Sequence, residues 1–598
     1  MGLETRLLMG NEAIALGAVR AGVRVVTGYP GTPSTEILET VAKQRDERIY
    51  VEWSTNEKSA LEVAAGAAYA GARVMVTMKQ VGLNVASDPL MSLNYVGVKG
   101  GMVIVVADDP GPISSQTEQD TRHFGVFAKL MVFDPSTPEE AYLMIAEAFA
   151  YSEKYSRPVL FRPTTRVCHS YASVTLLPEL PAKEPEGFSK DNGRFVIFPR
   201  LTFQNHKIIE GQLVKLRDDF SSYERNQLSG GGKKGIATGG VSYAYVRESL
   251  AEIEEPYKLL KISTVPFPEK LALEFLDELD EVLVIEELDP VIERELILLC
   301  GKKHISLTIK GKTSGHVQNA GENTVQSVRE ALYDFFKKEL PALPVPEPPA
   351  LPVRPPVLCA GCPHRGAFFA VKEAAKGKKA VYSGDIGCYT LGNALPLDMV
   401  DTCLCMGAGI TVAQGINRVE PDTLNFAFIG DSTFFHTGLP GVVNAVYNEA
   451  NIIICILDNY TTAMTGNQPH PGMGVTAAGA AVRKISIYDV VKAIGVSEIV
   501  RVNPFDLPGS IEAVKGVLSK KGVRVLLFEG PCIAVAKGSV PHEINEEKCT
   551  GCKVCVRKIG CPAMYMENGK CVIDPVLCTG CGVCVSLCRF HAIERGRG

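Results

Sequence analysis

Two runs of cysteines near the C-terminus constrain the fold of this chain more than any other feature. The first run has the spacing C-x2-C-x2-C-x5-C-P and consists of Cys549, Cys552, Cys555 and Cys561. The second has the spacing C-x2-C-x2-C-x3-C and consists of Cys578, Cys581, Cys584 and Cys588. Three thiolates at such intervals let one tight loop wrap three corners of an iron–sulfur cube. We therefore expect residues 541–598 to form a small ferredoxin-like α+β domain with two 4Fe-4S clusters.

In the two-cluster ferredoxin arrangement, the fourth cysteine of each run ligates the other cluster. This predicts one cluster on Cys549, Cys552, Cys555 and Cys588, and a second on Cys578, Cys581, Cys584 and Cys561. The longer gap before Cys561 departs from the standard pattern and leaves this crossover open. The alternative is a pair of structural zinc sites, but zinc motifs pair two C-x2-C units across a longer gap. Cys571 lies outside both runs and is assigned a structural role.

The rest of the 598-residue chain alternates apolar runs with helix-forming segments. The runs at 23–30, 73–79, 102–109, 425–431 and 451–459 are short and continuous, as in parallel sheets covered on both faces. The proline-rich segment 340–357 predicts a stiff linker, and a polar stretch around 182–232 predicts a boundary or a long loop. We expect an α/β chain of doubly wound domains over 1–180, 181–339 and 358–540, followed by the ferredoxin-like domain.

Composition limits the classes of function. A formal net charge of -5, with 22% charged residues, gives no general attraction to nucleic acid or to an anionic membrane. The apolar runs are too short to span a bilayer, and no signal-peptide pattern opens the sequence, so a cytoplasmic location is predicted. In a large chain of this kind, the 18 cysteines favour reduced thiols that hold clusters over disulfides.

The segment from Gly430 to Asn459 carries a second cofactor pattern. An apolar strand ends in Gly430, Asp431 and Ser432, a helix follows, and a second apolar strand ends in Asp458 and Asn459. The two strand ends should be neighbours at the carboxyl edge of a parallel sheet, where such folds bind ligands. Gly430 would let a phosphate approach the backbone, and Asp431 and Asn459 offer the hard oxygen ligands that suit Mg²⁺. The pattern resembles the thiamine diphosphate signature, although a Gly-Asp pair by itself often only ends a strand.

Thiamine diphosphate also needs a glutamate that hydrogen-bonds its aminopyrimidine ring, and in such enzymes this residue comes from a different α/β domain. Glu57, which stands just before an alanine-rich helical stretch, is the best candidate. The alternative is an ordinary first-turn glutamate that the helix dipole favours.

A set of segments, read in order along the chain, is similar to the 2-oxoacid:ferredoxin oxidoreductases. The segments are YPGTPSTE (29–36), the Glu57 segment, SSQTEQDTR (114–122), CAGCPHRG (359–366), GDSTFFHTG (430–438), LDNYTTAMTGNQP (457–469) and the double cysteine tail. The resemblance covers essentially the full chain. It implies a pyrimidine-binding domain at 1–180, a transketolase-C-like domain at 181–339, a diphosphate-binding domain at 358–540 and the ferredoxin domain last.

The matched motifs imply a role for several residues. Thr32 would approach the substrate carboxylate and Glu57 would activate the cofactor. Asp431, Asn459 and the backbone carbonyl of Thr461 would hold Mg²⁺.

Other residues beside the motifs are assigned to the same site. Gly387 and Ser432 are predicted to bind the cofactor, and His364 is predicted to be catalytic. His436 and His470 share the expectation of handling protons or phosphate. For each histidine the alternative is a hydrogen-bonded residue that only supports the site.

A third cluster is predicted close to the cofactor. Cys359, Cys362 and Cys388 are spaced C-x2-C-x25-C, and Cys532 follows the strand at 524–530. In similar enzymes four cysteines at matching places hold a proximal cluster, whereas the alternative is a set of reduced buried thiols. Met464 stands where pyruvate oxidoreductases carry an asparagine, which suits a roomier and more apolar substrate pocket.

The activity that the resemblance implies is oxidative decarboxylation of an aryl 2-oxoacid, such as indolepyruvate, phenylpyruvate or hydroxyphenylpyruvate, to an acyl-CoA and CO₂. The cofactor supplies the electron sink, and electrons leave singly through the clusters to ferredoxin. A smaller beta subunit is the expected partner, in a dimer of heterodimers. The rival interpretations are a non-oxidative thiamine decarboxylase or carboligase, which would not need the cysteine tail, and a non-enzymatic electron-transfer or scaffold subunit.

Overall fold

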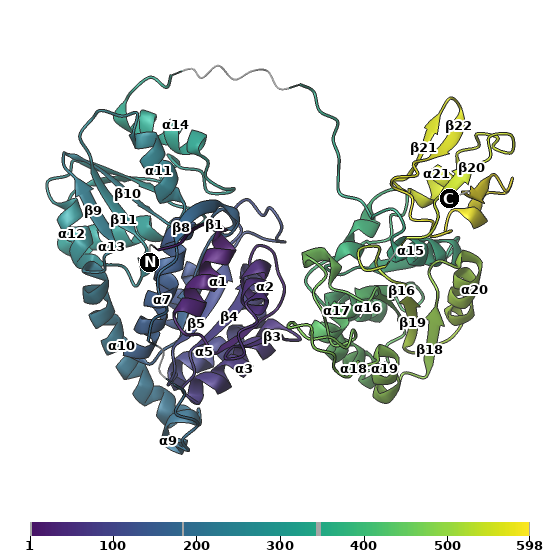
Figure 1. Ribbon diagram of the computed structural model, residues 1–598, viewed down its shortest axis with the longest axis horizontal. Coiled ribbons are helices and arrows are strands. Elements are labelled where there is room, and N and C mark those ends of the chain that lie inside the picture. The colour runs from purple at the N-terminus through teal and green to yellow at the C-terminus, as the bar shows by residue number, and fades with distance from the viewer. Residues whose placement is uncertain (1–2, 182–183, 342–348, 537, 597–598) are drawn as a thin grey trace. The chain divides into compact units, whose positions relative to one another are not determined.

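A computed structural model describes residues 3–181, 184–341, 349–536 and 538–596 and divides into two compact units, Met1–Glu347 and Pro348–Gly598 (Figure 1). The predicted linker 340–357 spans this division. Residues 342–348 of it lie outside the described residues, and the described remainder, 340–341 and 349–357, contains no helix or strand.

The first part of unit 1 is built on a seven-stranded sheet in the order β12-β6-β7-β5-β4-β2-β3. The strands β2, β4 and β5 coincide with predicted apolar runs and pair in parallel. Helices α1, α2 and α7 pack together, and α3 and α5 pack together on the core that covers β4 and β5. The elements are β1 (Thr5–Met9), α1 (Gly10–Arg20), β2 (Val25–Gly28), α2 (Thr35–Lys43), β3 (Tyr50–Trp53), α3 (Glu57–Tyr69), β4 (Val74–Lys79), α4 (Gln80–Val85), α5 (Ser87–Val96), β5 (Met102–Ala107), α6 (Arg122–Ala128), β6 (Met131–Phe133), α7 (Pro138–Tyr155), β7 (Val159–Phe161), α8 (Thr165–His169) and β8 (Tyr171–Thr175).

The second part of unit 1 is a five-stranded sheet in the order β14-β13-β10-β11-β9. Helices α12 and α13 cover one face of it and α11 and α14 the other, each with its own apolar core. The short strand β12 follows β11 in the chain but pairs antiparallel with β6, so it belongs to the seven-stranded sheet. The elements are β9 (Gln227–Gly230), β10 (Lys234–Gly239), α11 (Ser242–Leu250), β11 (Lys258–Ile262), β12 (Thr264–Val265), α12 (Glu269–Leu276), β13 (Glu281–Ile285), α13 (Val291–Lys303), β14 (Thr308–Lys310) and α14 (Val325–Phe336).

The segment 182–232 differs from the predicted boundary or loop, because it contains α9 (Asn192–Phe195) and the 23-residue helix α10 (Pro199–Ser221). Proline is tolerated in the first turn of a helix, where the backbone N–H has no helical partner. Leu201, Ile209, Leu216 and Phe220 are the buried residues of α10. This narrow apolar stripe was hidden among many polar residues in the sequence.

The first part of unit 2 is a parallel sheet in the order β15-β16-β17-β19-β18. Helices α15 and α20 pack together against one face, and α16, α18 and α19 belong to the core on the other. The elements are α15 (Pro363–Ala374), β15 (Ala380–Ser383), the 3-10 helix η1 (Cys388–Asn393), α16 (Ala408–Val419), β16 (Leu424–Gly430), α17 (Asp431–Thr433), the π-helix η2 (Phe434–Gly438), α18 (Leu439–Tyr447), β17 (Ile453–Asp458), the 3-10 helix η3 (Ala463–Thr465), α19 (Ile487–Ile494), β18 (Glu498–Val502), α20 (Leu507–Leu518) and β19 (Arg524–Glu529).

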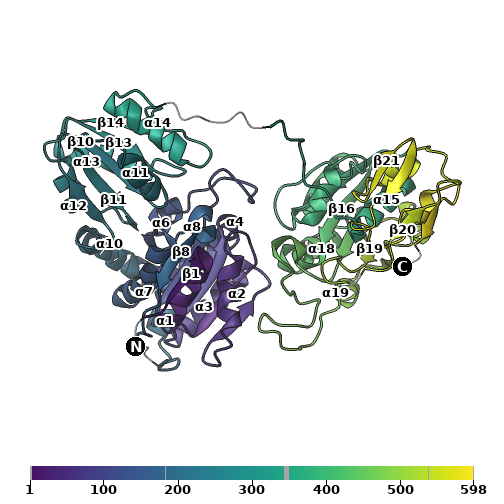
Figure 2. The same ribbon diagram turned by 45° about the horizontal axis from the view of Figure 1, so that its top comes forward.

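The cysteine tail forms two small antiparallel sheets, β20-β23 and β21-β22. Its buried residues belong to the same apolar core as α15, and Figure 2 shows the tail, in yellow, next to the rest of unit 2. The elements are β20 (His542–Ile544), α21 (Val554–Ile559), β21 (Met564–Glu567), β22 (Lys570–Ile573), the 3-10 helix η4 (Val585–Leu587) and β23 (Ile593–Arg595). The predicted fold class, doubly wound α/β domains with a small C-terminal α+β domain, is confirmed.

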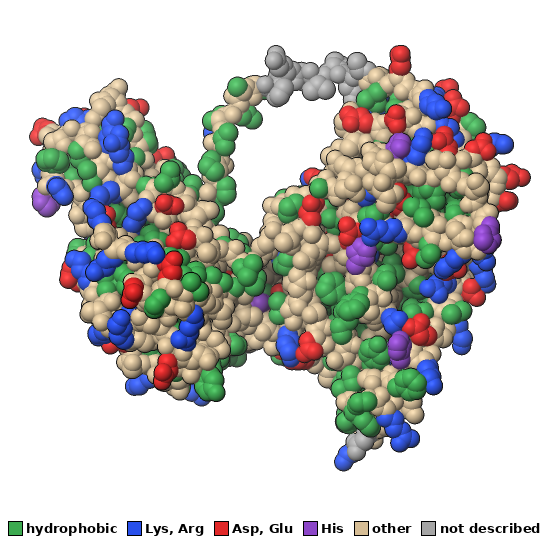
Figure 3. Space-filling view, turned by 180° about the vertical axis from the view of Figure 1, so that it is seen from behind, with side chains coloured by type: hydrophobic (Ala, Val, Ile, Leu, Met, Phe, Trp, Pro, Cys, Tyr) green, Lys and Arg blue, Asp and Glu red, His purple; other side chains and the backbone are tan. Residues whose placement is uncertain are grey.

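Among the described residues, no helix combines the length and the apolar character needed to cross a membrane. Acidic and basic side chains are interspersed on the surface of each unit that Figure 3 shows. Exposed apolar side chains also occur around α9 and the start of α10, among them Phe188, Val196, Phe198 and Phe203.

Candidate active site

The predicted diphosphate residues lie at adjacent strand ends in unit 2. Strands β16 and β17 pair in parallel with Gly430 opposite Leu457, so the residues that follow them meet at the carboxyl edge of the sheet. The backbone N–H of Asn459 donates to Asp431 Oδ2 at 3.1 Å, and that of Ser432 donates to Asp431 Oδ1 at 2.8 Å. The Asp431 carboxylate is therefore fixed between the two strand ends, as the sequence predicts.

Two further oxygens converge beside this carboxylate. Asn459 Oδ1 lies 3.2 Å from Asp431 Oδ2 and 2.7 Å from the carbonyl oxygen of Thr461. Facing oxygens repel each other unless a cation lies among them or the amide turns over, in which case its NH₂ group donates to both. A carboxylate, an amide oxygen and a backbone carbonyl are the hard ligands that Mg²⁺ takes, so the donor set fits the predicted ion.

Two polar side chains, those of His470 and Asp458, interact with Asp431. His470 Nε2 lies 3.1 Å from Asp431 Oδ2. Burial would raise the pKa of Asp431, but the neighbouring His470 and the hydrogen bonds to the carboxylate hold it below its ordinary value. Burial, followed by the charge of Asp431, raises the pKa of Asp458 to about 7. His436 is buried, with Nδ1 3.1 Å from Thr437 Oγ1.

His364 is 3% exposed, and neither of its ring nitrogens has a hydrogen-bond partner among the described residues. Burial lowers its pKa to about 4, while the charge of Asp431 opposes this change, so the ring is neutral at pH 7. Its ring meets Tyr389 edge-on, with the centroids 5.8 Å apart. A buried imidazole with an unused donor and an unused acceptor is costly unless a ligand satisfies it. This orphaned ring fits a polar ligand such as a diphosphate.

Tyr389 explains why two predicted site residues are glycines. A Cβ at Gly387 would lie 2.4 Å from Tyr389 Cε1, and a Cβ at Gly430 would lie 2.5 Å from the same atom. The Tyr389 hydroxyl contacts the carbonyl of Ile386 at 3.0 Å and Thr433 Oγ1 at 3.1 Å. Close approach of this ring therefore requires glycine at both positions. Sequence reasoning missed Tyr389, because nothing in its spacing distinguishes it from a core tyrosine.

Glu57 occupies the first position of α3 in unit 1. Asn56 caps this helix by accepting a hydrogen bond from the Ser59 N–H at 2.8 Å. Glu57 is thus a first-turn residue, as the alternative interpretation holds, but it is also 5% exposed. Its carboxylate lies over Gly82 of α4, where a Cβ would come within 2.6 Å of Glu57 Oε1.

Thr32 and the SSQTEQDTR segment meet at the end of β4. Ser114 Oγ donates to the carbonyl of Thr32 at 3.3 Å, and Lys79 Nζ donates to the carbonyl of Ser114 at 3.2 Å. Burial lowers the pKa of Lys79, while the charges of Asp109 and Glu57 oppose this change. Lys79 therefore connects to Thr32 through the Ser114 hydrogen bonds and interacts with Glu57 through its charge. Sequence reasoning missed this residue, and the available signal was a lysine that ends an otherwise apolar strand.

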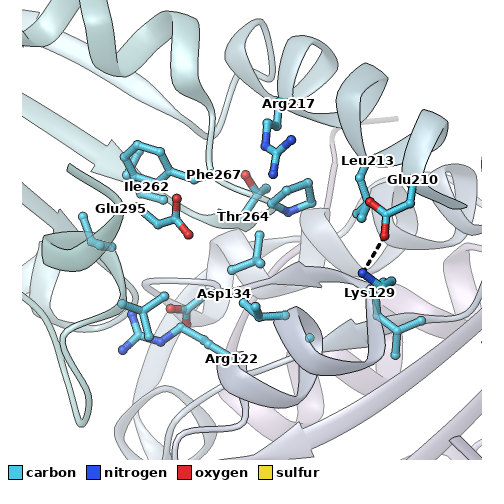
Figure 4. Close-up of a pocket in the computed structure, with 17 residues that line it drawn as sticks. Arg122, Lys129, Asp134, Glu210, Leu213, Arg217, Ile262, Thr264, Phe267 and Glu295 are labelled. Carbon is cyan, nitrogen blue, oxygen red and sulfur yellow. Dashed lines mark hydrogen bonds and ion pairs between the residues drawn. The ribbon is translucent and has the colours of Figure 1, made fainter. Parts of the chain in front are cut away.

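The end of the SSQTEQDTR segment has a structural role. Arg122 Nη2 lies 2.6 Å from Asp120 Oδ2, and Arg122 Nη1 lies 2.8 Å from Glu286 Oε2. All three side chains are buried, and they join α6 to the residue that follows β13. Beside them is a cavity of about 220 Å³ that Figure 4 shows, with the Lys129–Glu210 ion pair along its wall. None of the predicted site residues lines this cavity.

The proximal cysteines are neighbours beside the diphosphate site. The Cys532 N–H donates to the carbonyl of Asn459 at 3.0 Å. Burial raises the pKa of Cys388 to about 11, and the charges of Cys532 and Cys359 add to this effect. Burial likewise raises the pKa of Cys362 to about 12, with contributions from Cys359 and Cys388. The charge of Cys359 therefore reaches both Cys362 and Cys388, and that of Cys532 reaches Cys388.

In the tail, the four cysteines assigned to the second cluster line one cavity. They are Cys561, Cys578, Cys581 and Cys584. Cys362 lines the same cavity, and the crossover stays a prediction. Among the residues that the structure describes, no three Cys, His, Asp or Glu side chains are close enough to hold a single metal ion.

The cysteines assigned to the first cluster differ in exposure. Cys549 and Cys555 are buried, Cys588 is half-buried and Cys552 is exposed. A hydrogen bond from Cys571 lowers the pKa of Cys555 to about 6, so Cys571 supports a predicted ligand.

Three family models match the chain. The model for the thiamine-binding domain of pyruvate flavodoxin/ferredoxin oxidoreductase matches residues 16–212. The C-terminal thiamine pyrophosphate-binding domain of thiamine pyrophosphate enzymes matches residues 385–528, and the 4Fe-4S binding domain matches residues 571–594.

Curated relatives match over nearly the whole length. The indolepyruvate oxidoreductase subunit IorA of Pyrococcus abyssi is 41% identical, over 99% of this chain and 97% of its own. The same subunit of Thermococcus kodakarensis is 42% identical, also over 99% and 97%. A solved 2-oxoglutarate:ferredoxin oxidoreductase from Magnetococcus marinus has a TM-score of 0.45 and 17% identity, over 56% of this chain and 65% of its own. The chain belongs to the 2-oxoacid:ferredoxin oxidoreductase family, within the group of indolepyruvate oxidoreductase IorA subunits.

Proposed function

We propose that this chain catalyses the oxidative decarboxylation of an aryl 2-oxoacid to the acyl-CoA and CO₂, and passes the electrons through 4Fe-4S clusters to ferredoxin. The observation that carries the proposal is that unit 2 contains both an oxygen site and two groups of cysteines. There an oxygen site suited to Mg²⁺ and a diphosphate lies beside one group of four cysteines, and a second group lines a cavity in the tail. A decarboxylase without electron transfer has no use for these cysteines.

Different residues of the chain would bind the metal ion, the diphosphate and the aminopyrimidine ring of the cofactor. Asp431, Asn459 and the Thr461 carbonyl would hold Mg²⁺, and the neutral His364 ring would donate to the diphosphate. Glu57 would hold the aminopyrimidine ring of the cofactor. Bound thiamine diphosphate supplies the electron sink into which the substrate decarboxylates.

Further residues would bind the substrate and support the cofactor. Thr32 would receive the substrate carboxylate, with Lys79 beside it as a positive charge. Gly387 and Ser432 complete the cofactor side of the site, where Ser432 Oγ accepts from Thr462 Oγ1 at 3.0 Å. We keep the domain assignment of 1–180 for the pyrimidine half, 181–339 for the transketolase-C-like domain, 358–540 for the diphosphate half and 541–598 for the ferredoxin domain.

We propose a proximal third cluster on Cys359, Cys362, Cys388 and Cys532, because Cys532 contacts Asn459 and the charges of Cys359 and Cys532 reach Cys388. Iron quantitation on the anaerobically reconstituted chain tests this cluster. About twelve iron atoms per chain would support it and about eight would exclude it, because each cube holds four irons.

The preference for aryl substrates is inferred from two sources. The curated relatives are named for indolepyruvate. Met464 is 52% exposed in η3, three residues after Thr461, so an apolar side chain stands near the oxygen site. A partner subunit is inferred from the word subunit in the relatives' names, and ferredoxin and coenzyme A from the reaction class. We keep the cytoplasm as the proposed location.

The test is anaerobic viologen reduction by the complex of this chain with its partner subunit, using a panel of 2-oxoacids. We expect aryl pyruvates to give the highest kcat/KM, and Glu57→Ala to abolish the reaction while the clusters remain. Unchanged activity in Glu57→Ala would favour the electron-transfer or scaffold interpretation. Release of CO₂ without viologen reduction would favour a non-oxidative decarboxylase.

A further inference from the structure

Arg365 joins the two cysteine regions of unit 2. It lies in the first turn of α15, three residues after Cys362, and is 5% exposed. Its Nη1 donates to the carbonyls of Ile559 at 2.8 Å and Gly560 at 2.7 Å, immediately before Cys561. Its Nη2 donates to the carbonyls of Leu358 and Cys359. One guanidinium therefore holds the backbone at Leu358 and Cys359, where the first cysteine segment begins, and the backbone just before Cys561, the last cysteine of the first tail run.

This buried cation has no anionic partner in the described residues. No carboxylate lies within 4.0 Å of the guanidinium there, and Arg365 Nε has no hydrogen-bond partner. Arginine remains charged in proteins, and a buried charge without a counter-charge is strongly destabilising. The four carbonyl partners are neutral dipoles, so the site still requires a negative charge.

The cysteines around Arg365 are the source of that charge. Arg365 lines the same cavity as Cys561 and Cys581, together with Cys362. Burial lowers the pKa of Arg365, and the thiolates oppose this change, first that of Cys561 and then that of Cys362. Cysteines that ligate a cluster are deprotonated, and both cluster sites would be anionic when loaded.

We propose that Arg365 is a positioning residue that serves as the shared counter-charge of two clusters, the proximal one beside Cys359 and Cys362 and the tail one beside Cys561 and Cys581. Its charge raises the reduction potential of the tail cluster, and its hydrogen bonds fix the tail to α15. This inference rests on the proposed function, because it needs both groups of thiols to hold iron.

The expected effect follows from the levers that set cluster potentials, which include net charge and hydrogen bonds around the cluster. Arg365→Gln keeps hydrogen-bond donors but removes the positive charge, so reduction of the neighbouring cluster becomes less favourable. We expect at least a tenfold fall in the ratio of reduced to oxidised cluster at a fixed potential. For a one-electron couple this is a shift of about 59 mV toward negative values.

Lys558 supplies a matched control. Its Nζ lies 3.0 Å from Glu373 Oε1 of α15, so it also ties the tail to that helix with a positive charge. However, its side chain is 43% exposed, and solvent screens such a charge. Lys558→Gln therefore removes a docking contact near Cys561 without removing a buried charge.

The experiment is a potentiometric titration of the holoenzyme followed by electron paramagnetic resonance, with iron measured on each sample. At a fixed potential, Arg365→Gln should lower the ratio of reduced to oxidised tail cluster at least tenfold. In Arg365→Lys and Lys558→Gln this ratio should stay within threefold of the wild type. An unchanged cluster potential in an iron-replete Arg365→Gln complex would overturn this inference and leave the proposed function standing. Equal shifts in Arg365→Gln and Lys558→Gln would also overturn it, because docking and not charge would be responsible.

Two further outcomes are decisive. If Arg365→Gln does not retain iron, the cluster potential of the Arg365→Lys complex is measured instead. A wild-type potential there supports the inference, and a tenfold fall overturns it. A wild-type complex that binds no iron would overturn this inference together with the proposed function.

Discussion

Replacing Gly82 by alanine tests whether the Glu57 carboxylate acts from the position that the structure gives it. The added Cβ would lie 2.6 Å from Glu57 Oε1, 2.8 Å from its Cγ and 3.0 Å from its Cδ. Ordinary van der Waals contact begins near 3.4 Å, so the carboxylate must move by about 0.8 Å. The atoms that clash belong to the end of a flexible side chain, so the fold can absorb the change.

A misplacement of about 1 Å in a catalytic site costs on the order of 10²-fold in rate. We therefore expect kcat/KM of Gly82→Ala to fall by about 10- to 100-fold, which corresponds to roughly 1.4 to 2.7 kcal/mol of transition-state stabilisation. Stability should change little, because alanine in a helix is favoured over glycine by about 0.5–1 kcal/mol. Activity is therefore predicted to fall while stability stays close to that of the wild type.

Gly66→Ala is the matched control. Gly66 lies within α3 itself, and a Cβ there would meet nothing within 4 Å. It gains the same helix propensity without displacing Glu57, so it should keep wild-type activity. The assay is anaerobic viologen reduction by the complex, with unfolding followed by circular dichroism. Full activity in Gly82→Ala, or an equal loss in Gly66→Ala, would refute the assigned role of Glu57.

Further predictions concern the cofactor site, a buried acid and the tail. Asp431→Asn should weaken the binding of Mg²⁺ and thiamine diphosphate by at least tenfold in calorimetry, while the unfolding transition stays intact. Burial raises the pKa of Glu287 from 4.5 to about 7, so its proton contributes about 3 kcal/mol of stability that is present below pH 4.5 and lost as the pH rises through 7. Glu287→Gln should remove this dependence from the melting temperature, and an unchanged pH profile would contradict the assignment. Cys561→Ser should remove about four irons, the content of one cube, whereas Cys571→Ser should retain them; the reverse result would overturn the assignment of Cys561 as a cluster ligand.

The sequence was sufficient for the strands, because buried parallel strands are continuous apolar runs. The predicted runs at 425–431 and 451–459 became β16 (Leu424–Gly430) and β17 (Ile453–Asp458) with nearly the same limits. Their pairing placed Asp431 and Asn459 together, as expected from the topology of such sheets. The helix α10 was not predicted, since only a narrow stripe of its residues is buried.

Contacts that depend on three-dimensional proximity could not be read from the sequence. The requirement for glycine at 387 and 430 comes from the ring of Tyr389, and not only from room for a phosphate. The contact between His470 and Asp431 joins residues 39 positions apart in the chain. Lys79 and Arg365 look like ordinary surface cations in the sequence, and their roles appear only from what surrounds them in the fold.

The central claim is that Glu57 and Asp431 are both needed for substrate electrons to reach the cysteine tail. The most direct measurement is a single anaerobic turnover of the complex with coenzyme A and indolepyruvate, without any external acceptor, followed through the visible absorbance of the clusters. We predict that substrate bleaches the wild-type clusters, and that Glu57→Gln and Asp431→Asn bleach only on addition of dithionite. Wild-type clusters that dithionite reduces but substrate leaves oxidised would contradict the account.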